Sequence, residues 1–270
     1  MPTLRAAREE VRVSPSSVVA GPDVVRELQE RAARALPALH VEEADGWWLR
    51  HNPGSVWWAG TVLPHREAEP DELVHRIARA ERFYAARGAV ARFQISPGAC
   101  PSRLDAELAR RGYRQERLVS LRMAATAQVL VRLPDTAMRV DVEDRPTPTW
   151  FDGWYAVHGH DSDPGLERSM LERVTSPSGY AHAMIGSEVV AVGRAVIDTG
   201  WAGLFGMATL PRARGKGAAR SVLAALACWA DAHRADHMYL QVEHDNVPAL
   251  RLYERAGFTE VCRYHHRSAE

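Results

Sequence analysis

The sequence predicts an α+β fold made of two similar domains, each with a mixed, mostly antiparallel sheet flanked by helices. The second half opens with strand-like apolar runs, continues into a long alanine-rich helical pattern at 217–232, and then alternates strand, helix and strand. The first half follows a similar order of elements. A chain of 270 residues also exceeds the usual size of one domain, so we expect domains at 1–130 and 131–270.

In the first half, helical spacing at 22–36 is followed by two aromatic runs around Trp47 and Trp57. Turn residues at 51–54 separate these runs, which is typical of a hairpin. The remaining expected elements of this half are helices at 71–87 and 102–111, strands at 90–96 and 117–123, and, within 124–148, a last strand, a turn at Pro134-Asp135 and a new strand near 138–142. The domain boundary is placed in this last segment.

Apolar periodicity also places the elements of the second half. Short runs rich in β-branched and aromatic residues indicate strands, whereas 3.6-residue spacing indicates helices. The expected elements are helices at 150–157, 166–174, 217–232 and 248–256, and strands at 180–185, 189–198, 201–209, 237–243 and 259–267.

A glycine-containing loop precedes the long helical pattern of the second half. It reads Arg214-Gly215-Lys216-Gly217-Ala218-Ala219. The first N–H groups of a helix lack intrahelical partners, and the positive end of the helix dipole favours an anion there. Gly215 and Gly217 lack a Cβ that would keep a diphosphate away from the backbone, and Arg214 and Lys216 add positive charge. The loop therefore predicts a phosphate cradle.

A second motif follows the loop downstream, with the pattern Asn246-x-x-Ala249-x-x-Leu252-Tyr253-x-x-x-Gly257-Phe258. Together the two motifs resemble those of the GNAT family of acyl-CoA-dependent N-acetyltransferases, whose pyrophosphate loop has the pattern Arg/Gln-x-x-Gly-x-Gly/Ala. The strong part of the match covers roughly residues 190–263. The resemblance implies acetyl-CoA as cosubstrate and direct transfer of the acetyl group to an amine in a ternary complex.

By the same resemblance, the strands on either side of the long helix splay apart, and the backbone of the first one binds the pantetheine arm. The cofactor-binding residues implied are Met207, Ala208, Thr209, Arg214, Gly215, Lys216, Gly217, Ala218, Ala219, Asn246 and Tyr253. N–H groups near Met207 and Ala208 would meet the developing oxyanion. Asn246 is expected to cap the helix that starts near Val247 or Pro248, and in relatives its side chain reaches the pantetheine.

Two residues are candidates for proton transfer. A phenol has a reference pKa of about 10 and a thiol of about 8.5, so Tyr253 stays protonated at neutral pH and can protonate the leaving sulfur as general acid. Glu243, at the end of a strand that faces the expected cleft, can serve as general base. An equally weighted interpretation of Glu243 is a solvated charge at a strand end.

The first half looks like a degenerate copy of the second. Residues 93–96 align with 240–243, and 108–113 align with 252–258 when Gly112 is set on Gly257. In this alignment the acidic segment 67–72 stands where the cradle would be, and Leu108 stands in the place of Tyr253. Chance similarity between two unrelated α+β domains is the alternative.

Composition limits the partners. The 34 Lys and Arg balance the 34 Asp and Glu, so there is no global basic surface for nucleic acid or an anionic membrane. An apolar leader and a membrane-length run are absent from the sequence, and we expect a cytoplasmic protein. The three cysteines indicate neither a disulfide framework nor a zinc site, and no metal is expected.

The acceptor is expected to be a small-molecule or protein amine, and the protein is expected to be a monomer or homodimer. The alternative function is a non-catalytic acyl-CoA-binding or regulatory module that keeps the cradle. A nucleotide-hydrolysing protein is disfavoured because Gly217, rather than Ser or Thr, follows Lys216.

Overall fold

The computed structural model describes residues 21–54, 59–134, 138–159 and 162–269. Within them, one mixed sheet of 11 strands runs through the whole molecule in the order β1-β2-β3-β4-β11-β5-β10-β9-β8-β7-β6. The strands are β1 (His40–Ala44), β2 (Trp47–His51), β3 (Val62–Leu63), β4 (Arg92–Ile95), β5 (Arg114–Ala125), β6 (Val140–Glu143), β7 (Ser178–Ile185), β8 (Glu188–Asp198), β9 (Trp201–Thr209), β10 (His237–Glu243) and β11 (Thr259–Ser268). The α+β prediction is confirmed.

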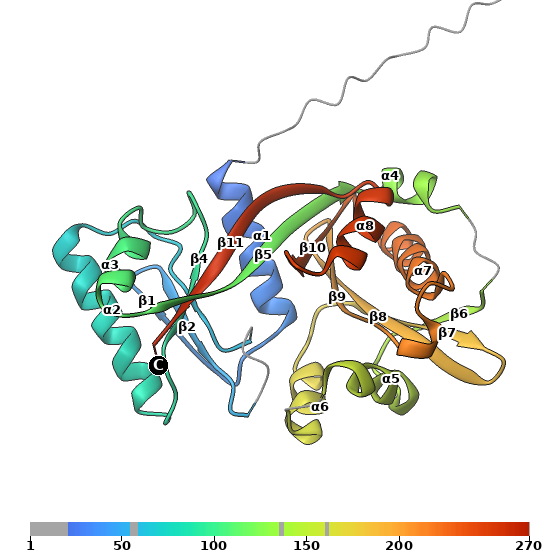
Figure 1. The fold of residues 1–270 in the computed structure, drawn as a ribbon, viewed down its shortest axis with the longest axis horizontal. Helices are drawn as coiled ribbons and strands as arrows, with labels where there is room; N and C mark the ends of the chain where they lie inside the picture. Colours follow the sequence, from blue (N-terminus) through green and yellow to red (C-terminus); the bar gives the residue numbers. More distant parts are fainter. Residues whose placement is uncertain (1–20, 55–58, 135–137, 160–161, 270) are drawn as a thin grey trace, which may run out of the picture.

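Helices flank this sheet (Figure 1). They are α1 (Pro22–Ala35), α2 (Pro70–Ala85), α3 (Leu104–Arg110), α4 (Thr126–Arg132), α5 (Pro148–His158), α6 (Pro164–Glu172), α7 (Ala218–Ala232) and α8 (Val247–Arg255). None of the helices in the described ranges is both long enough and apolar enough to span a membrane.

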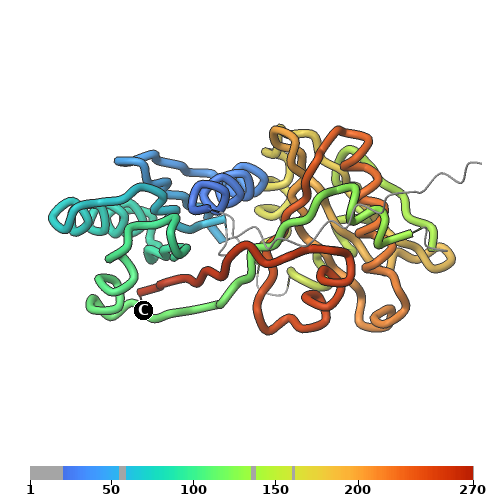
Figure 2. Tube along the Cα trace, turned by 90° about the horizontal axis from the view of Figure 1, so that it is seen from above, coloured from blue at the N-terminus to red at the C-terminus, as the bar shows by residue number. Residues whose placement is uncertain are grey.

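The two halves of the chain exchange their last strands. β5, which ends the first half, pairs with β10 of the second half over Val119–Ala125, and β11 pairs with β4 of the first half over His265–Ser268. β5 and β11 also pair with each other along their length. Figure 2 shows the last strand running alongside β5 into the first half. The sheet of each half is therefore completed by the other half, and the division at 130/131, which falls within α4, stays a prediction.

The internal repeat is visible in the helix ends that precede the exchanged strands. After α3, Gly112 has φ 86° and Tyr113 N donates to Leu108 O at 3.0 Å. After α8, Gly257 has φ 100° and Phe258 N donates to Tyr253 O at 2.9 Å. Both ends have the six-to-one hydrogen bond of a Schellman motif, which requires a residue with positive φ. The structure thus places Leu108 where the second half has Tyr253.

An ion pair ties the end of β11 to the first half. Asp105 of α3 accepts from Arg267 at 2.8 Å and contacts His265 at 2.9 Å. The hydrogen bond from Arg267, followed by that from His265, holds the pKa of Asp105 below its usual value. A lowered folded-state pKa stabilises the protein above the unfolded value of about 4, and this contribution is lost as the pH falls through the folded pKa.

We therefore expect Asp105→Asn to lower the unfolding free energy at pH 7 and to leave it nearly unchanged below the folded pKa of Asp105. Because the Asp105 side chain is 41% exposed, the loss should be at most about 1 kcal/mol. Urea unfolding of both proteins at a series of pH values measures it. A difference that is the same at every pH would contradict the assigned cause.

Two elements differ from the sequence-based expectations. β1 was not predicted, and α4 occupies the segment where a last strand was expected. Val129 is fully buried in the core with α7, while Val131 is 82% exposed. The β-branched residues favour a strand locally, but burying one helical face against α7 decides the outcome. The expected strand start at 55–58 lies outside the described residues.

The faces of the sheet carry different helices in the second half. A Cβ built on Gly193 of β8 would meet Val222 of α7, so Gly193 lies on the face of the sheet that α7 covers. The next residue, Arg194, faces the other way and donates to Ala35 O at the end of α1. α5 lies on this second face as well. A Cβ built on Gly153 of α5 would lie 3.1 Å from the side chain of Val192, which is on the same face of β8 as Arg194.

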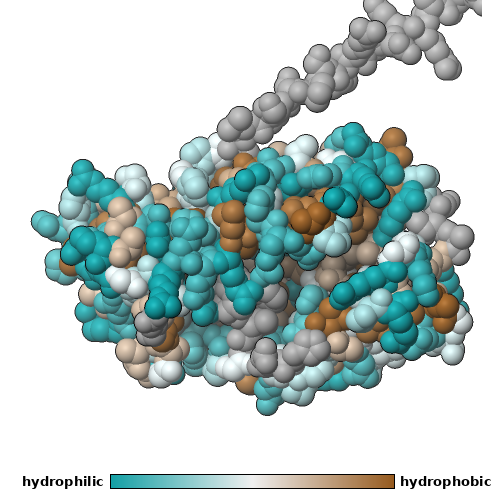
Figure 3. All heavy atoms as spheres, viewed as in Figure 1, coloured by the Kyte–Doolittle hydropathy of each residue, from teal (hydrophilic) through white to brown (hydrophobic). Residues whose placement is uncertain are grey.

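The surface seen in Figure 3 is mostly polar. Apolar residues on this face form small separate patches rather than one continuous area. Exposed large apolar side chains such as Val131 and Val247 lie on different helices. Scattered apolar residues are normal for a protein surface, so this face offers no extended apolar docking area.

Candidate active site

β9 and β10 diverge in the second half. The two parallel strands pair over Trp201–Leu204 and His237–Leu240, although they continue to Thr209 and Glu243. Gly206 has φ 60°, and the pairing of β9 with β8 shifts register opposite it. A bulge of this kind re-aims the backbone. The segment of β9 from Phe205 onward, including Met207, Ala208 and Thr209, therefore borders the gap between the strands on its β10 side.

The predicted cradle lies beyond the end of β9, at the start of α7. Gly217 is the residue before the helix, with φ 85°, and no described side chain caps the helix N-terminus. Gly215 has φ 77°, and a Cβ built on either glycine would meet no atom within 4 Å. Arg214 and Lys216 are exposed. The first amides of α7 thus face open space with two cations beside them, as an anion site requires.

α8 brings Tyr253 to the same side of the sheet as α7. Asn246 caps α8 by accepting from Ala249 N at 3.3 Å, so its predicted capping role is confirmed. Tyr253 is 6% exposed and packs edge-on against Phe258 with ring centroids 5.9 Å apart. Burial raises its pKa far above that of an exposed tyrosine. The phenol therefore keeps its proton at every physiological pH.

The exchanged strand β5 fixes α8 in place. The guanidinium of Arg122, which is 7% exposed, donates to Glu254 at 3.1 Å and to Phe258 O at 3.5 Å. These acceptors lie one residue after Tyr253 and at the start of β11. A residue of the first half therefore orients the helix that carries the predicted general acid.

Glu243 lies at the end of β10 in an ion pair with Arg117 of β5. The Arg117 Nη1 to Glu243 Oε1 distance is 2.6 Å, and the two side chains are 47% and 42% exposed. The structure places Glu243 at a strand end, as expected, and adds a cation from the first half that the sequence did not reveal. The ion pair holds the Glu243 carboxylate in place at the end of β10.

The last turn of α5 packs against the bulge in β9. A Cβ on Gly206 would lie 3.1 Å from the Trp154 ring, and His158 Nε2 lies 3.2 Å from Met207 O. His158 is not among the site residues predicted from the sequence. Only the fold brings this imidazole to the bulge, since it lies 48 positions before Gly206 in the sequence. Histidine is the side chain that most often acts as a general acid or base.

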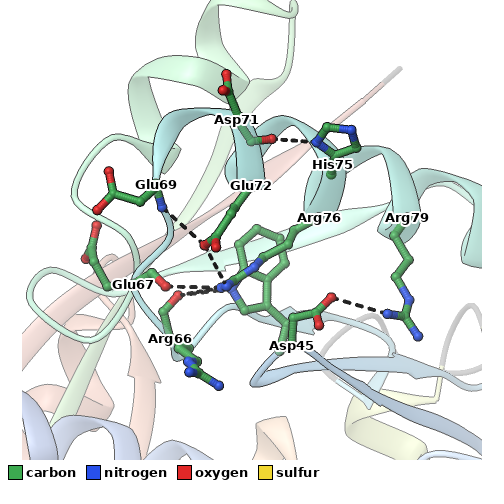
Figure 4. A network of polar contacts seen from close by, with 10 residues as sticks. Asp45, Arg66, Glu67, Glu69, Asp71, Glu72, His75, Arg76 and Arg79 are labelled. Carbon is green, nitrogen blue, oxygen red and sulfur yellow. Dashed lines mark hydrogen bonds and ion pairs between the residues drawn. The ribbon is translucent and has the colours of Figure 1, made fainter.

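The counterpart of the cradle in the first half is closed to an anion. Figure 4 shows the start of α2, where Glu69, Asp71 and Glu72 gather around the first helical turn. The Glu72 carboxylate accepts from Glu69 N at 3.4 Å, and Pro70 contributes no N–H. Arg76 pairs with Glu72 at 3.1 Å. The negative charge predicted for this segment therefore lies where a phosphate would have to bind.

The strand gap of the first half is filled as well. β3 and β4 pair in parallel only at Val62 and Phe93. Gln29 of α1 donates to Ser96, which follows β4, and lies 3.0 Å from His65, which follows β3. These buried side chains bridge the two strand ends. Among the described residues, the open strand gap with a free helix N-terminus is thus found in the second half.

Acetyl-CoA suits the site of the second half. Open space over Gly215 and Gly217, together with the uncapped N-terminus of α7, provides a place for the diphosphate. Tyr253 packs in the same core cluster as residues of α7. The described residues contain no group of three His, Cys, Asp or Glu that could bind a metal ion.

Comparison with known proteins agrees with this geometry. A family described as "Probable histone acetyltransferase Rv0428c C-terminal" matches residues 23–269. The chain is 26% identical over 247 residues to "Uncharacterized N-acetyltransferase YobR" of Bacillus subtilis, covering 91% of this chain and 98% of that protein.

Solved structures show the same fold. A GCN5-related N-acetyltransferase from Kribbella flavida has a TM-score of 0.70 at 16% identity, covering 91% of this chain and 95% of that one. A tandem GNAT protein from the clavulanic acid biosynthesis pathway has a TM-score of 0.64 at 11% identity, covering 93% and 97%. The family match spans nearly all of the described residues, and the chain therefore belongs to the Rv0428c C-terminal acetyltransferase family, as a GNAT N-acetyltransferase.

Proposed function

We propose that the protein transfers the acetyl group of acetyl-CoA to a primary amine by direct attack in a ternary complex, at the site of the second half. The observation that carries this proposal is the uncapped N-terminus of α7 next to the open gap between β9 and β10. Acetyl-CoA supplies an activated thioester when bound. The two domains, 1–130 and 131–270, are proposed to be an inactive and an active copy of one fold.

Different groups of the protein are assigned to binding the cosubstrate and to the transfer chemistry. We assign the diphosphate to the amides of Gly215, Gly217, Ala218 and Ala219, with Arg214 and Lys216 as charge partners, and the pantetheine to β9 near Met207, Ala208 and Thr209 and to Asn246. Backbone N–H groups at Met207 and Ala208 would stabilise negative charge on the carbonyl oxygen. Tyr253 would protonate the departing sulfur.

Glu243 is the proposed general base. Its Oε1 is paired with Arg117, and this ion pair competes for the oxygen that would accept the proton. His158 at the β9 bulge is a second candidate. Comparison of Glu243→Gln with His158→Gln decides between them, because only loss of the true base should remove the rise of kcat/KM with pH.

Two measurements test the function as a whole. Calorimetry of the intact protein with acetyl-CoA should show binding, and thiol release should depend on an added amine from a broad panel. Mass spectrometry of protein with acetyl-CoA alone should show no acetyl-enzyme. Absence of acetyl-CoA binding would reject the proposed site, and binding without release by any amine would favour a regulatory module.

Tyr253→Phe should lower kcat by roughly 100-fold, because a proton donor in the transition state contributes about that factor or more. The dissociation constant for acetyl-CoA should change little, since the ring remains. Steady-state thiol release and calorimetry measure the two quantities.

Tyr113→Phe is the matched control, because it removes a part-buried hydroxyl beside the equivalent helix end of the first half. This variant should keep full activity. Equal losses in both variants would show that the effect of Tyr253→Phe is structural rather than chemical.

A further inference from the structure

The buried cation Arg194 lies near the proposed site but has no role in the acetyl-transfer steps proposed above. Arg194 of β8 is 2% exposed, and its Nη2 donates to Ala35 O at 2.9 Å. Its Nη1 is buried and has no hydrogen-bond partner among the described residues. A buried guanidinium normally has all its N–H groups paired, because leaving one unpaired costs stability.

Among the residues that the structure describes, no carboxylate pairs with Arg194. Burial lowers the pKa of its guanidinium, and the nearby phenol of Tyr180, which also hydrogen-bonds to it, and that of Tyr239 partly oppose this effect. The guanidinium carbon lies 5.3 Å from the centroid of the Phe205 ring and 5.9 Å from that of Tyr180. Aromatic faces attract a cation but do not neutralise it. The described surroundings of this charge are thus aromatic rings, the Tyr180 phenol and one carbonyl, and Nη1 is left unpaired.

The position of Arg194 relates it to the acetyl-transfer site. Its cross-strand partner is Phe205, the residue before the Gly206 bulge, and neighbouring strands lie about 4.8 Å apart. It faces α1 and α5, on the opposite side of the sheet from α7. The buried guanidinium therefore lies close to Phe205 and the Gly206 bulge, one strand away from the gap between β9 and β10.

We propose that the amine acceptor carries a carboxylate that binds Arg194; this inference rests on the proposed function and narrows its substrate class. A carboxylate oxygen can accept from the unpaired Nη1 of this guanidinium in a charge-assisted hydrogen bond. A phosphate dianion would bring more charge into an aromatic enclosure, at a greater desolvation cost. Because Arg194 is nearly inaccessible, binding must displace a neighbouring ring, and we expect Phe205 to move.

The test compares amines that differ only in this group. Amino acids, including β-alanine and γ-aminobutyrate to vary the spacing, are assayed by thiol release against their carboxamides. Wild-type protein should prefer the carboxylates in kcat/KM. Arg194→Gln should lower kcat/KM for the best carboxylate roughly 10- to 100-fold, as expected for loss of a charged hydrogen bond, and change that for its amide less than about twofold. Arg194→Lys should retain part of the preference.

A second variant controls for docking of α1. Arg34 of α1 donates to Asp198 at 2.8 Å, so Arg34→Gln weakens a contact between α1 and β8 without touching the aromatic enclosure. It should keep the carboxylate preference. Equal loss for carboxylates and amides in Arg194→Gln, or equal loss of preference in Arg34→Gln, would show that Arg194 only positions α1 and would overturn the proposal.

A binding readout separates this inference from the function itself. N-acetylated amino acids, added with CoA, should raise the melting temperature of the wild-type protein more than the corresponding N-acetyl amides do, and Arg194→Gln should abolish the difference. If acetyl-CoA binds but no amine is acetylated, the proposed function fails while this measurement still reports on Arg194. Equal melting-temperature shifts from acids and amides would refute the carboxylate site.

Discussion

Gly217→Asp is expected to weaken acetyl-CoA binding strongly while leaving the protein folded. Gly217 precedes α7 with φ 85°, and a Cβ there meets no other atom within 4 Å. An aspartate would place its own carboxylate at the helix N-terminus, much as Glu72 does at the start of α2. Repulsion between this charge and one phosphate charge about 5 Å away is about 3 kcal/mol at an effective dielectric constant near 20.

The resulting loss of affinity is roughly 100-fold, and calorimetry measures it. Gly217→Asn is the matched control, because asparagine has the same shape and tolerates positive φ equally well but carries no charge. It should lose far less affinity than Gly217→Asp. Similar affinities for the two variants would mean that the diphosphate does not bind at this turn.

Separation of the two halves is expected to have an even larger effect. A fragment of residues 135–270 lacks β5, which pairs with β10 on one side and with β11 on the other. Both strands would then present unpaired edges, and Arg122 would no longer anchor α8. We expect this fragment alone to be insoluble or unfolded, as judged by circular dichroism and size-exclusion chromatography.

Co-expression of 1–134 with 135–270 provides the control for this experiment. The two fragments together contain every strand of the sheet, so they should associate and recover acetyl-CoA binding. A fragment 135–270 that is folded, monomeric and able to bind acetyl-CoA without its partner would contradict the reciprocal dependence of the two halves.

The sequence alone predicts those parts of the site whose residues are close together in the chain. The cradle at 214–219 and the helix around Tyr253 are local motifs, in which glycine conformation and helix capping determine the geometry. The repeat was also detectable, because Gly112 and Gly257 satisfy the same requirement for positive φ.

Long-range pairings could not be predicted in this way. The exchange of β5 and β11 depends on which strand occupies each sheet position, and either strand's own pattern is compatible with pairing inside its own half. The ion pair between Arg117 and Glu243 follows from that exchange. The burial of Arg194 depends on long-range packing, because Ala35 at the end of α1 and the rings of Tyr180 and Phe205 surround its guanidinium. The α4 segment had local strand features that tertiary packing overrode.

The late position of β11 in the chain has a consequence for biosynthesis. The N-terminal half cannot complete its sheet until His265–Ser268, which pair with β4, have left the ribosome. While translation of the second half proceeds, the edge of β4 stays exposed and open to wrong partners. Contacts this distant in sequence also slow folding. We therefore expect this protein to depend most on chaperones while the ribosome-bound chain still lacks β11.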